Sequence, residues 1–273
     1  MGAFFLFQRK QLPSDPALNN MSESSCHKNR PSCHIGCSGW YYASWRGVFY
    51  PPELSPSLWL DFYSDHFDTV EINSSFYRLP SETAVAHWGR STPDRFVFSP
   101  KASRHLTHMA KLQDSGTGLV SFLEHFSPLE KKLGPILFQL PPYWKQNAER
   151  LEFFLKSLPS GYRYAFEMRN PGWHNDRIYA LLEAYGAAFC IFDLAGFRSP
   201  VVLTAEFAYI RLHGPGPVPY TGSYSTGCLQ DLAERILDWQ STRAIYVYFN
   251  NDRDACSIQN AMALKKMLSL RFP

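Results

Sequence analysis

The chain has 273 residues, 45% of them hydrophobic, with a formal net charge of +3 and a pI of about 8.5. This length fits one (β/α)8 barrel of about 250 residues better than two small domains. The mildly basic charge neither requires nor excludes a nucleic-acid partner. The cysteines form no C-x-x-C pair, which excludes a zinc-ribbon spacing and favours free thiols in the reducing cytoplasm.

The first 32 residues differ in composition from the rest of the chain. The apolar run AFFLF is too short to span a membrane and lacks the basic start of a signal peptide. Residues 8–32 are rich in Ser, Pro, Asn and charge. We expect residues 1–32 to form a poorly ordered extension, with Met21 as an alternative start, and residues 33–273 to form the barrel domain. No later segment approaches the length of a membrane span.

Eight short apolar runs follow, and each ends at a polar or ionisable residue. They are residues 35–37, 69–72, 96–98, 136–138, 164–166, 188–192, 209–212 and 244–249. Strands that helices cover on both faces read as near-continuous apolar runs. Eight such runs predict an α/β fold, a single (β/α)8 TIM-type barrel, in which functional groups lie at the carboxyl ends of the strands.

Helical patterns fill most of the gaps between these runs. They cover residues 57–66, 81–91, 118–133, 148–158, 175–185, 228–240 and 257–270. The second of them starts clearly, because Ser81 follows a Pro and precedes Glu82. Residues 194–208 contain Pro200 and lack a helical period, so we expect the sixth crossover to be an irregular loop.

Polar pairs end the second and fifth runs. Glu71 and Asn73 lie two residues apart, as do Glu167 and Arg169, so each pair shares one face of its strand. We predict that both pairs face the barrel axis near its mouth, with Glu71 and Glu167 as candidate catalytic groups for proton transfer. The alternatives are interior polar pairs satisfied by neighbouring strands, and an ion pair between Glu167 and Arg169.

Basic side chains end the third and seventh runs. Arg211 and His213 share a face and precede a loop rich in Gly and Pro, where barrels often hold phosphate. We expect Arg211 to anchor an anionic ligand rather than the fold, and His213 to act as an acid or base. Lys101, followed by His105 and His108, is a candidate phosphate contact or nucleophilic amine, and an exposed ion-pairing Lys is the alternative.

The other candidates for substrate binding are polar or aromatic residues near strand ends. Polar ones suit sugar hydroxyls or base edges, and aromatic ones suit the face of a sugar ring or base, although core packing also explains aromatic residues. They are Trp40, Asn73, Tyr77, His108, Gln139, Trp173, Asp193, Tyr220, Asn250 and Asn251. We predict one cavity that is shared by Glu71, Asn73, Gln139, Glu167, Arg169, Asp193, Arg211 and His213.

The sequence predicts no metal and no cofactor. The cysteines lack ligand spacing, and the histidines are dispersed. The spacing of His105 and His108 would place both on one helical face, but the other ligands that a metal needs are scattered. A metal bound at His108 or His213 is the alternative.

Seven sequence blocks resemble those of the DUF72 family, also called the YecE-like family. They are GCSGWYYASWRGVFYP at 36–51, VEINSSFYRLP at 70–80, KASRHLTH at 101–108, LGPILFQLPP at 133–142, FEMRNPGW at 166–173, YIRLHG at 209–214 and VYFNND at 247–252. The resemblance runs from about residue 34 to the C-terminus, whereas residues 1–33 have no counterpart and Cys37 stands where Thr is usual. It implies a TIM-type barrel and leaves the reaction open, because the family's activity is not established.

Proposals for that family include a likeness to sugar isomerases and to endonuclease IV-like nucleic-acid enzymes. The latter are metal-dependent, and the histidines here do not reproduce their ligand cluster. The residues themselves predict an enzyme, a hydrolase or isomerase that acts on a phosphorylated or polyhydroxylated substrate such as a sugar or nucleotide. Glycoside hydrolysis is a subcase that depends on the distance between Glu71 and Glu167.

Two other classes of protein remain open. One is a non-catalytic binder of nucleic acid or nucleotides that uses the same basic and aromatic rim, and its affinity would fall steeply with salt. The other is a scaffold without a ligand. The expected partner is therefore a small anionic or sugar-like molecule, with nucleic acid as the alternative and no membrane.

Overall fold

Each of the eight predicted runs forms a strand. The computed structural model describes residues 32–113, 116–241 and 243–270, in which the parallel strands are β1 (Cys33–Cys37), β2 (Thr69–Ile72), β3 (Val97–Pro100), β4 (Ile136–Leu140), β5 (Tyr164–Met168), β6 (Ala188–Leu194), β8 (Phe207–Leu212) and β9 (Ala244–Phe249). The described residues lie in one compact unit, Pro31–Pro273. The predicted extension, residues 1–32, falls outside the described residues apart from Ser32.

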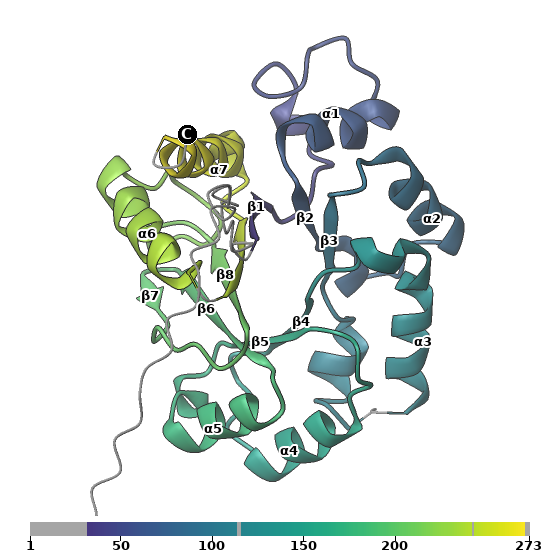
Figure 1. Cartoon of the computed structure of the whole chain (residues 1–273), viewed down its shortest axis with the longest axis vertical. Helices are drawn as coiled ribbons and strands as arrows, with labels where there is room; N and C mark the ends of the chain where they lie inside the picture. The colour runs from purple at the N-terminus through teal and green to yellow at the C-terminus, as the bar shows by residue number, and fades with distance from the viewer. Residues whose placement is uncertain (1–31, 114–115, 242, 271–273) are drawn as a thin grey trace, which may run out of the picture. The chain divides into compact units, whose positions relative to one another are not determined.

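The strands form two hydrogen-bonded ladders that isolated bridges connect. One ladder runs in the order β1-β9-β8-β6-β5-β4, and β2 and β3 form the other. Parallel bridges link Ser38 to Glu71 and Lys101 to Leu137, where the two ladders meet. Figure 1 shows the strands at the centre with the helices around them. This mostly parallel α/β arrangement is consistent with the predicted (β/α)8 barrel. The hydrogen-bonded ladders do not run continuously around the barrel, because they form two separate sheets.

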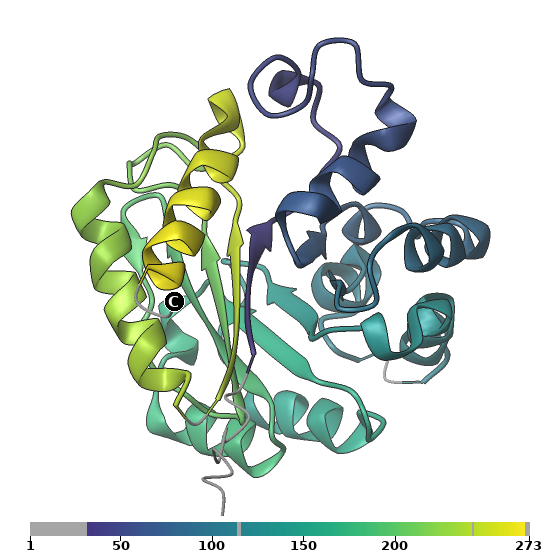
Figure 2. The same cartoon turned by 45° about the horizontal axis from the view of Figure 1, so that its top comes forward.

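The helices of the described residues lie close to the predicted boundaries. The α-helices are α1 (Trp59–His66), α2 (Glu82–Ser91), α3 (Thr117–Phe126), α4 (Ala148–Ser157), α5 (Asp176–Ala184), α6 (Thr226–Trp239) and α7 (Cys256–Ser269). Short helices in the loops are η1 (Ala43–Trp45), η2 (Pro56–Leu58), η3 (Ser74–Phe76), η4 (His105–Met109), η5 (Ser127–Lys132), η6 (Pro171–Trp173) and η7 (Arg253–Ala255). Figure 2 shows α6 and α7 side by side on the outer face of the strands.

Side-chain caps explain where four of the α-helices begin. Ser81, Asn147, Asn175 and Ser225 each accept a hydrogen bond from the backbone N–H three residues further on. Such a bond satisfies one of the N–H groups that the first turn of a helix leaves unpaired. None of the helices in the described residues is long and apolar enough to cross a membrane.

The sixth crossover, between β6 and β8, forms no α-helix, which confirms the predicted irregular connection. After β6 the chain turns at Ala195 and Gly196, both with positive φ, into the two-residue strand β7 (Phe197–Arg198). This strand pairs antiparallel with the end of β6. Residues 199–206, all described, then reach β8 without a helix or strand. The crossover from β6 to β8 therefore adds no helix of its own to the outer face of these strands, unlike a regular βα unit.

Buried side chains form two layers, one between strands and helices and one inside the ring of strands. The inner layer includes Leu137, Ala165, Ala188, Cys190, Phe192, Phe207, Tyr209, Tyr246 and Tyr248. In parallel strands, residues that pair in register point to the same face, so the pairing of Cys190 with Tyr209 marks inward positions of β6 and β8. Because side chains alternate along a strand, every second residue from these positions also faces inward, and this identifies the inward-facing residues at the strand ends. Cys37 and Cys190 are buried free thiols, as predicted.

Candidate functional site

Inward-facing residues at the ends of three strands form a charged cluster above the inner layer. Glu71 lies on β2, Glu167 and Arg169 lie at the end of β5, and Arg211 and His213 lie at the end of β8. All of them are fully buried except Arg169, whose side chain is 14% exposed. These strands are not neighbours in the sheet. The fold thus brings together side chains that are far apart in the sequence.

Arg211 is the centre of this cluster and contacts both buried glutamates. Its Nη2 donates to Glu71 Oε1 at 2.7 Å, and its Nη1 donates to Glu167 Oε2. None of the three side chains has exposed surface. Protein carboxylates occupy both arms of the guanidinium, so Arg211 contacts the fold in this structure, and its role as an anchor for an anionic ligand stays a prediction.

Glu71 is held as a carboxylate by several donors. Ser38 Oγ and Tyr209 OH donate to it at 2.7 and 2.8 Å, in addition to Arg211. Burial raises the pKa of Glu71, but the charge and hydrogen bond of Arg211 and the Ser38 hydroxyl outweigh burial, so the pKa is lowered. Sequence reasoning missed Tyr209, although it lies two residues before Arg211 on the same face of β8.

Glu167 accepts hydrogen bonds from two guanidiniums. Arg169 Nε donates to Glu167 Oε1 at 2.5 Å, so the ion pair that the sequence left open as an alternative is confirmed. Burial raises the pKa of Glu167, but Arg169 and Arg211 hold it well below its usual range. A carboxylate with a lowered pKa is a weak base and does not act as an acid near neutral pH. The two glutamates are thus suited to fixing the arginines.

His213 lies in the same cluster. Its Nε2 is 3.5 Å from Glu167 Oε2, and its Nδ1 is 2.9 Å from Asn250 Nδ2. Burial and the charge of Arg211 lower the pKa of His213 to about 4. Tyr220, in the loop after β8, packs edge-on against the imidazole with 5.6 Å between ring centroids. His213 is therefore uncharged near neutral pH, and this loop covers it.

Lys101 follows β3 and adds a third cation to the cluster. The exposed, ion-pairing Lys that the sequence left open does not occur, because Lys101 is buried and its Nζ has no hydrogen bond or ion pair to any described residue. Its Nζ lies 4.3 Å from the centroid of the Phe76 ring. Burial and the charge of Arg211 lower the pKa of Lys101 to about 7, although Glu167 and Glu71 oppose this shift. Lys101 therefore changes its charge near neutral pH.

Asp252, after β9, is a further group that titrates near neutral pH. Burial raises the pKa of Asp252 to about 7, although Ser257 and Tyr42 oppose the shift. It follows Asn250 and Asn251 in the polar block VYFNND that ends the last strand. The raised pKa of Asp252 depends on its burial, which no local pattern in this block reveals.

An aromatic cavity of about 730 Å³ is formed by residues of the segments that follow β1 and β2, together with α2. Three predicted binding residues, Trp40, Asn73 and Tyr77, line it, and the other lining residues are Gly39, Tyr41, Tyr42, Pro56, Ser57, Leu60, Ser74, His87 and Trp88. Tyr42 donates to the backbone oxygen of Ser38, whose side chain donates to Glu71, so this wall connects to the charged cluster. Aromatic walls with a few polar groups suit a sugar ring or a base.

Asp193 does not face the cluster, contrary to the prediction. The strand β6 continues to Leu194, and Phe192 pairs in register with the inward-facing Arg211, whereas Asp193 pairs with Leu212. Alternation along the strand therefore turns Phe192 inward and Asp193 outward, toward α6. Asp193 lines a different cavity, on the outer face of β6 and β8.

Trp173 and Asn251 are fully buried and contact the fold, so the structure favours a supporting role for both, and their predicted contact with a ligand stays a prediction. Trp173 Nε1 donates to the backbone oxygen of Trp144 at 2.8 Å. Asn251 Nδ2 donates to the Gly222 oxygen at 2.8 Å and to Asn260 Oδ1 at 2.9 Å. Asn251 therefore joins the loop after β8 to α7.

Gln139 and His108 lie beside the cluster. Gln139 pairs in register with Glu167 and so faces inward, and its Nε2 donates to the Leu140 oxygen at 2.9 Å. His108 packs edge-on against Phe76 with 4.9 Å between centroids, and burial lowers its pKa to about 4. Across the described ranges, no group of three or more His, Cys, Asp or Glu side chains is placed to hold a metal ion.

A family model described as "Protein of unknown function DUF72" matches residues 34–273. This chain belongs to the DUF72 family. The match confirms the resemblance that the sequence blocks show, and it covers every residue of the charged cluster and the aromatic cavity.

Relatives and solved structures agree with this membership. The UPF0759 protein YecE of Escherichia coli (strain K12) is 34% identical over 113 residues, 41% of this chain and 42% of YecE, so the aligned part spans less than half of that relative. The UPF0759 protein YunF of Bacillus subtilis (strain 168) is 24% identical over 272 residues, 88% of this chain and 95% of YunF.

Among solved structures, a DUF72 family protein from Thermotoga maritima has a TM-score of 0.79 and 29% identity, covering 87% of this chain and 99% of that one. A DUF72 family protein from Enterococcus faecalis has a TM-score of 0.76 at 19% identity, covering 88% and 97%, and supports the fold alone. None of these names specifies a substrate or a reaction.

Proposed function

We propose that this DUF72 barrel is an enzyme that binds a phosphorylated or polyhydroxylated substrate at the strand ends and transfers a proton through Lys101. The observation that supports the proposal is the charge of the cluster, in which three cations face two carboxylates. Arg211 and Arg169 contact the carboxylates of Glu71 and Glu167, and Lys101 lies near them without contact. With Lys101 protonated, one positive charge is left without a partner in a poorly hydrated place. An anionic group of a substrate would balance it.

The aromatic cavity supports the sugar or nucleotide part of the proposal. Trp40 and Tyr77 would pack against a sugar ring or a base, and the amide of Asn73 would bind hydroxyl groups. The anionic group would lie toward Lys101 and Arg169, because Arg211 has no exposed surface whereas these two cations retain a little.

Lys101 is the group in the cluster best suited to proton transfer. An acid or base works best when its pKa lies near the working pH, and the pKa of Lys101 is lowered to about 7. The pKa values of Glu71, Glu167 and His213 are all lowered, away from neutral pH. The roles predicted from the sequence are revised accordingly: the glutamates position the arginines, and Lys101 moves the proton.

Anion binding is expected to be coupled to proton uptake. Sulfate is a useful probe because it does not titrate between pH 6 and 9. A bound anion raises the pKa of Lys101, so the amine takes up a proton, and sulfate affinity should fall by up to about tenfold for each pH unit above 7. Calorimetry in two buffers of different ionisation enthalpy measures this uptake directly.

Lys101→Met should abolish the proton uptake, and Lys101→Arg should bind sulfate with no dependence on pH over this range, because a guanidinium stays protonated. Exposed Lys145→Met is the matched control and should behave like the wild type. Proton uptake that persists in Lys101→Met would assign it to another group and remove the support for Lys101.

Turnover is tested with a mixture of phosphorylated sugars and nucleotides, followed by phosphorus NMR. We expect a product whose formation Lys101→Met slows by about 100-fold or more. Oligonucleotide binding without turnover, with an affinity that falls by several powers of ten as salt rises, would instead identify a non-catalytic nucleic-acid binder.

A further inference from the structure

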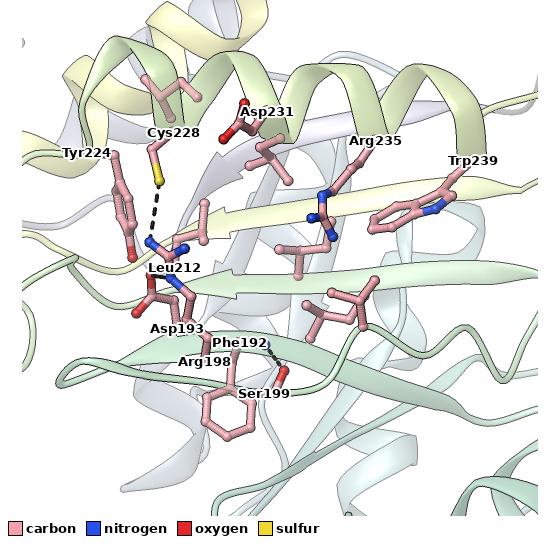
Figure 3. Close-up of a pocket in the computed structure, with 15 residues that line it drawn as sticks. Phe192, Asp193, Arg198, Ser199, Leu212, Tyr224, Cys228, Asp231, Arg235 and Trp239 are labelled. Atoms are coloured by element: carbon pink, nitrogen blue, oxygen red, sulfur yellow. Dashed lines mark hydrogen bonds and ion pairs between the residues drawn. The ribbon is translucent and has the colours of Figure 1, made fainter.

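A cavity of about 210 Å³ lies between α6 and the outer face of β6 and β8, beside the crossover that lacks a helix of its own. Outward-facing Ile191, Ile210 and Leu212 form its floor, and Leu232 of α6 contributes to its wall. Figure 3 shows α6 lying over the two strands with most of the lining side chains between them, and the Phe192 ring on the far side of the strands. The cavity is on the opposite face of β8 from Arg211, so it is separate from the charged cluster.

One end of this cavity holds an incompletely paired carboxylate. The side chain of Asp193 is 10% exposed, its Oδ2 is 3.5 Å from Arg198 Nε, and its Oδ1 has no hydrogen-bond partner among the described residues. Burial raises the pKa of Asp193, and Arg198 and the Tyr224 hydroxyl do not fully offset this shift. Arg198 also donates to Cys228 Sγ at 3.6 Å, which places this end near the start of α6 (Figure 3).

The other end holds a guanidinium with no partner. Arg235 lies seven residues after Cys228 on α6, about 10 Å along the helix axis. Figure 3 shows its side chain pointing from α6 toward the strands, beside Trp239. Within the part of the chain that the structure describes, Arg235 makes no hydrogen bond or ion pair, even with Asp231 one turn earlier.

We propose that this cavity binds a short linear ω-amino acid, with its ammonium group at Asp193, its carboxylate at Arg235 and its methylene chain on the apolar floor. Each end of such a ligand supplies the partner that the protein lacks there, a donor for the unpaired carboxylate oxygen and an acceptor for the guanidinium. Its methylene groups would take apolar floor surface out of water. The probe is 6-aminohexanoate, because its extended length is of the same order as the roughly 10 Å between Cys228 and Arg235 along α6.

Calorimetry with the full chain at pH 7 tests this site. The ligands are 6-aminohexanoate, hexanoate and hexylamine, of which the last two each lack one charge. We expect 6-aminohexanoate to bind at least tenfold more tightly than either, and Arg235→Gln and Asp193→Asn each to weaken its binding by about tenfold or more. Arg177→Gln, at an exposed arginine on α5, should leave the affinity unchanged.

Alkylation of cysteine, followed by mass spectrometry, locates the ligand. Bound 6-aminohexanoate should slow the modification of Cys228, which lines the cavity, and leave that of Cys256 unchanged, since Cys256 does not line it. Arg235 is exposed, so Arg235→Gln keeps the test valid if Asp193→Asn fails to fold. Equal affinities for hexylamine and 6-aminohexanoate, full binding by Arg235→Gln, or no binding heat at millimolar concentration would each overturn the proposal.

Discussion

Replacing Arg211 with Met is expected to lower the free energy of unfolding by about 3–5 kcal/mol. The substitution removes the cation that contacts both Glu71 and Glu167 and leaves two fully buried carboxylates poorly compensated. Denaturant titration at pH 7 measures the loss. In the wild type these carboxyls have lowered pKa values, so the stability that they contribute is present at neutral pH and is lost as the pH falls. In Arg211→Met the buried carboxyls should instead have raised pKa values. The difference in the free energy of unfolding between the wild type and Arg211→Met should therefore shrink toward pH 4.

The matched control is Arg177→Met on α5. Arg177 pairs with Glu149 at 2.8 Å, but its side chain is 64% exposed, so its loss should change the stability little. Arg211→Lys keeps a charge without the two-armed contact and should fall between wild type and Arg211→Met. Wild-type stability in Arg211→Met would show that the cluster does not support the fold, and Arg211 would become a ligand candidate again.

Replacing Trp173 with Ala is expected to lower the free energy of unfolding by about 3–5 kcal/mol. The indole is fully buried, packs edge-on against Trp144 with 5.1 Å between centroids and donates from Nε1 to the Trp144 oxygen. Its removal leaves a cavity in the segment after β5 and an unpaired Trp144 carbonyl in the segment after β4. Thermal or denaturant unfolding measures the effect.

Tyr143→Ala is the matched control, because it removes an aromatic side chain that is not buried. Tyr143 lies in the neighbouring segment after β4, but it is 66% exposed, so its removal should leave the stability nearly unchanged. If Trp173→Ala kept wild-type stability and lost affinity for a ligand instead, the binding role that the sequence predicted for Trp173 would be correct.

The strands and helices could be predicted because each has a local signature. Each buried strand is a short apolar run, and helices begin at capping residues such as Ser81 and Asn147. Which side of a strand faces inward could not be predicted in the same way, because both sides of these runs are apolar. Asp193 shows the result: it follows the run 188–192, so the sequence predicts it at the mouth of the barrel, but β6 continues through Asp193 and turns its side chain outward.

The site could be predicted in position but not in role. Glu71, Glu167 and Arg211 lie at strand ends, and the carboxyl ends of parallel strands meet at one edge. Their pairing depends on long-range register, since Arg211 is 140 residues from Glu71 and 44 from Glu167. The lowered pKa of Lys101 depends on its burial close to Arg211, and no local pattern in KASRHLTH reports burial.

The position of Arg211 also limits how this chain can be divided. Glu71 belongs to the first four strands of the barrel, whereas Arg211 and Glu167 belong to the last four, and the cation contacts both carboxylates. A fragment that ended after β4 would have to bury Glu71 without its cation or leave the inner face of β2 in water. A fragment that began at β5 would keep Arg211 but lose one of its two carboxylates. The two halves are therefore electrostatically complementary, and neither is a complete folding unit without the other.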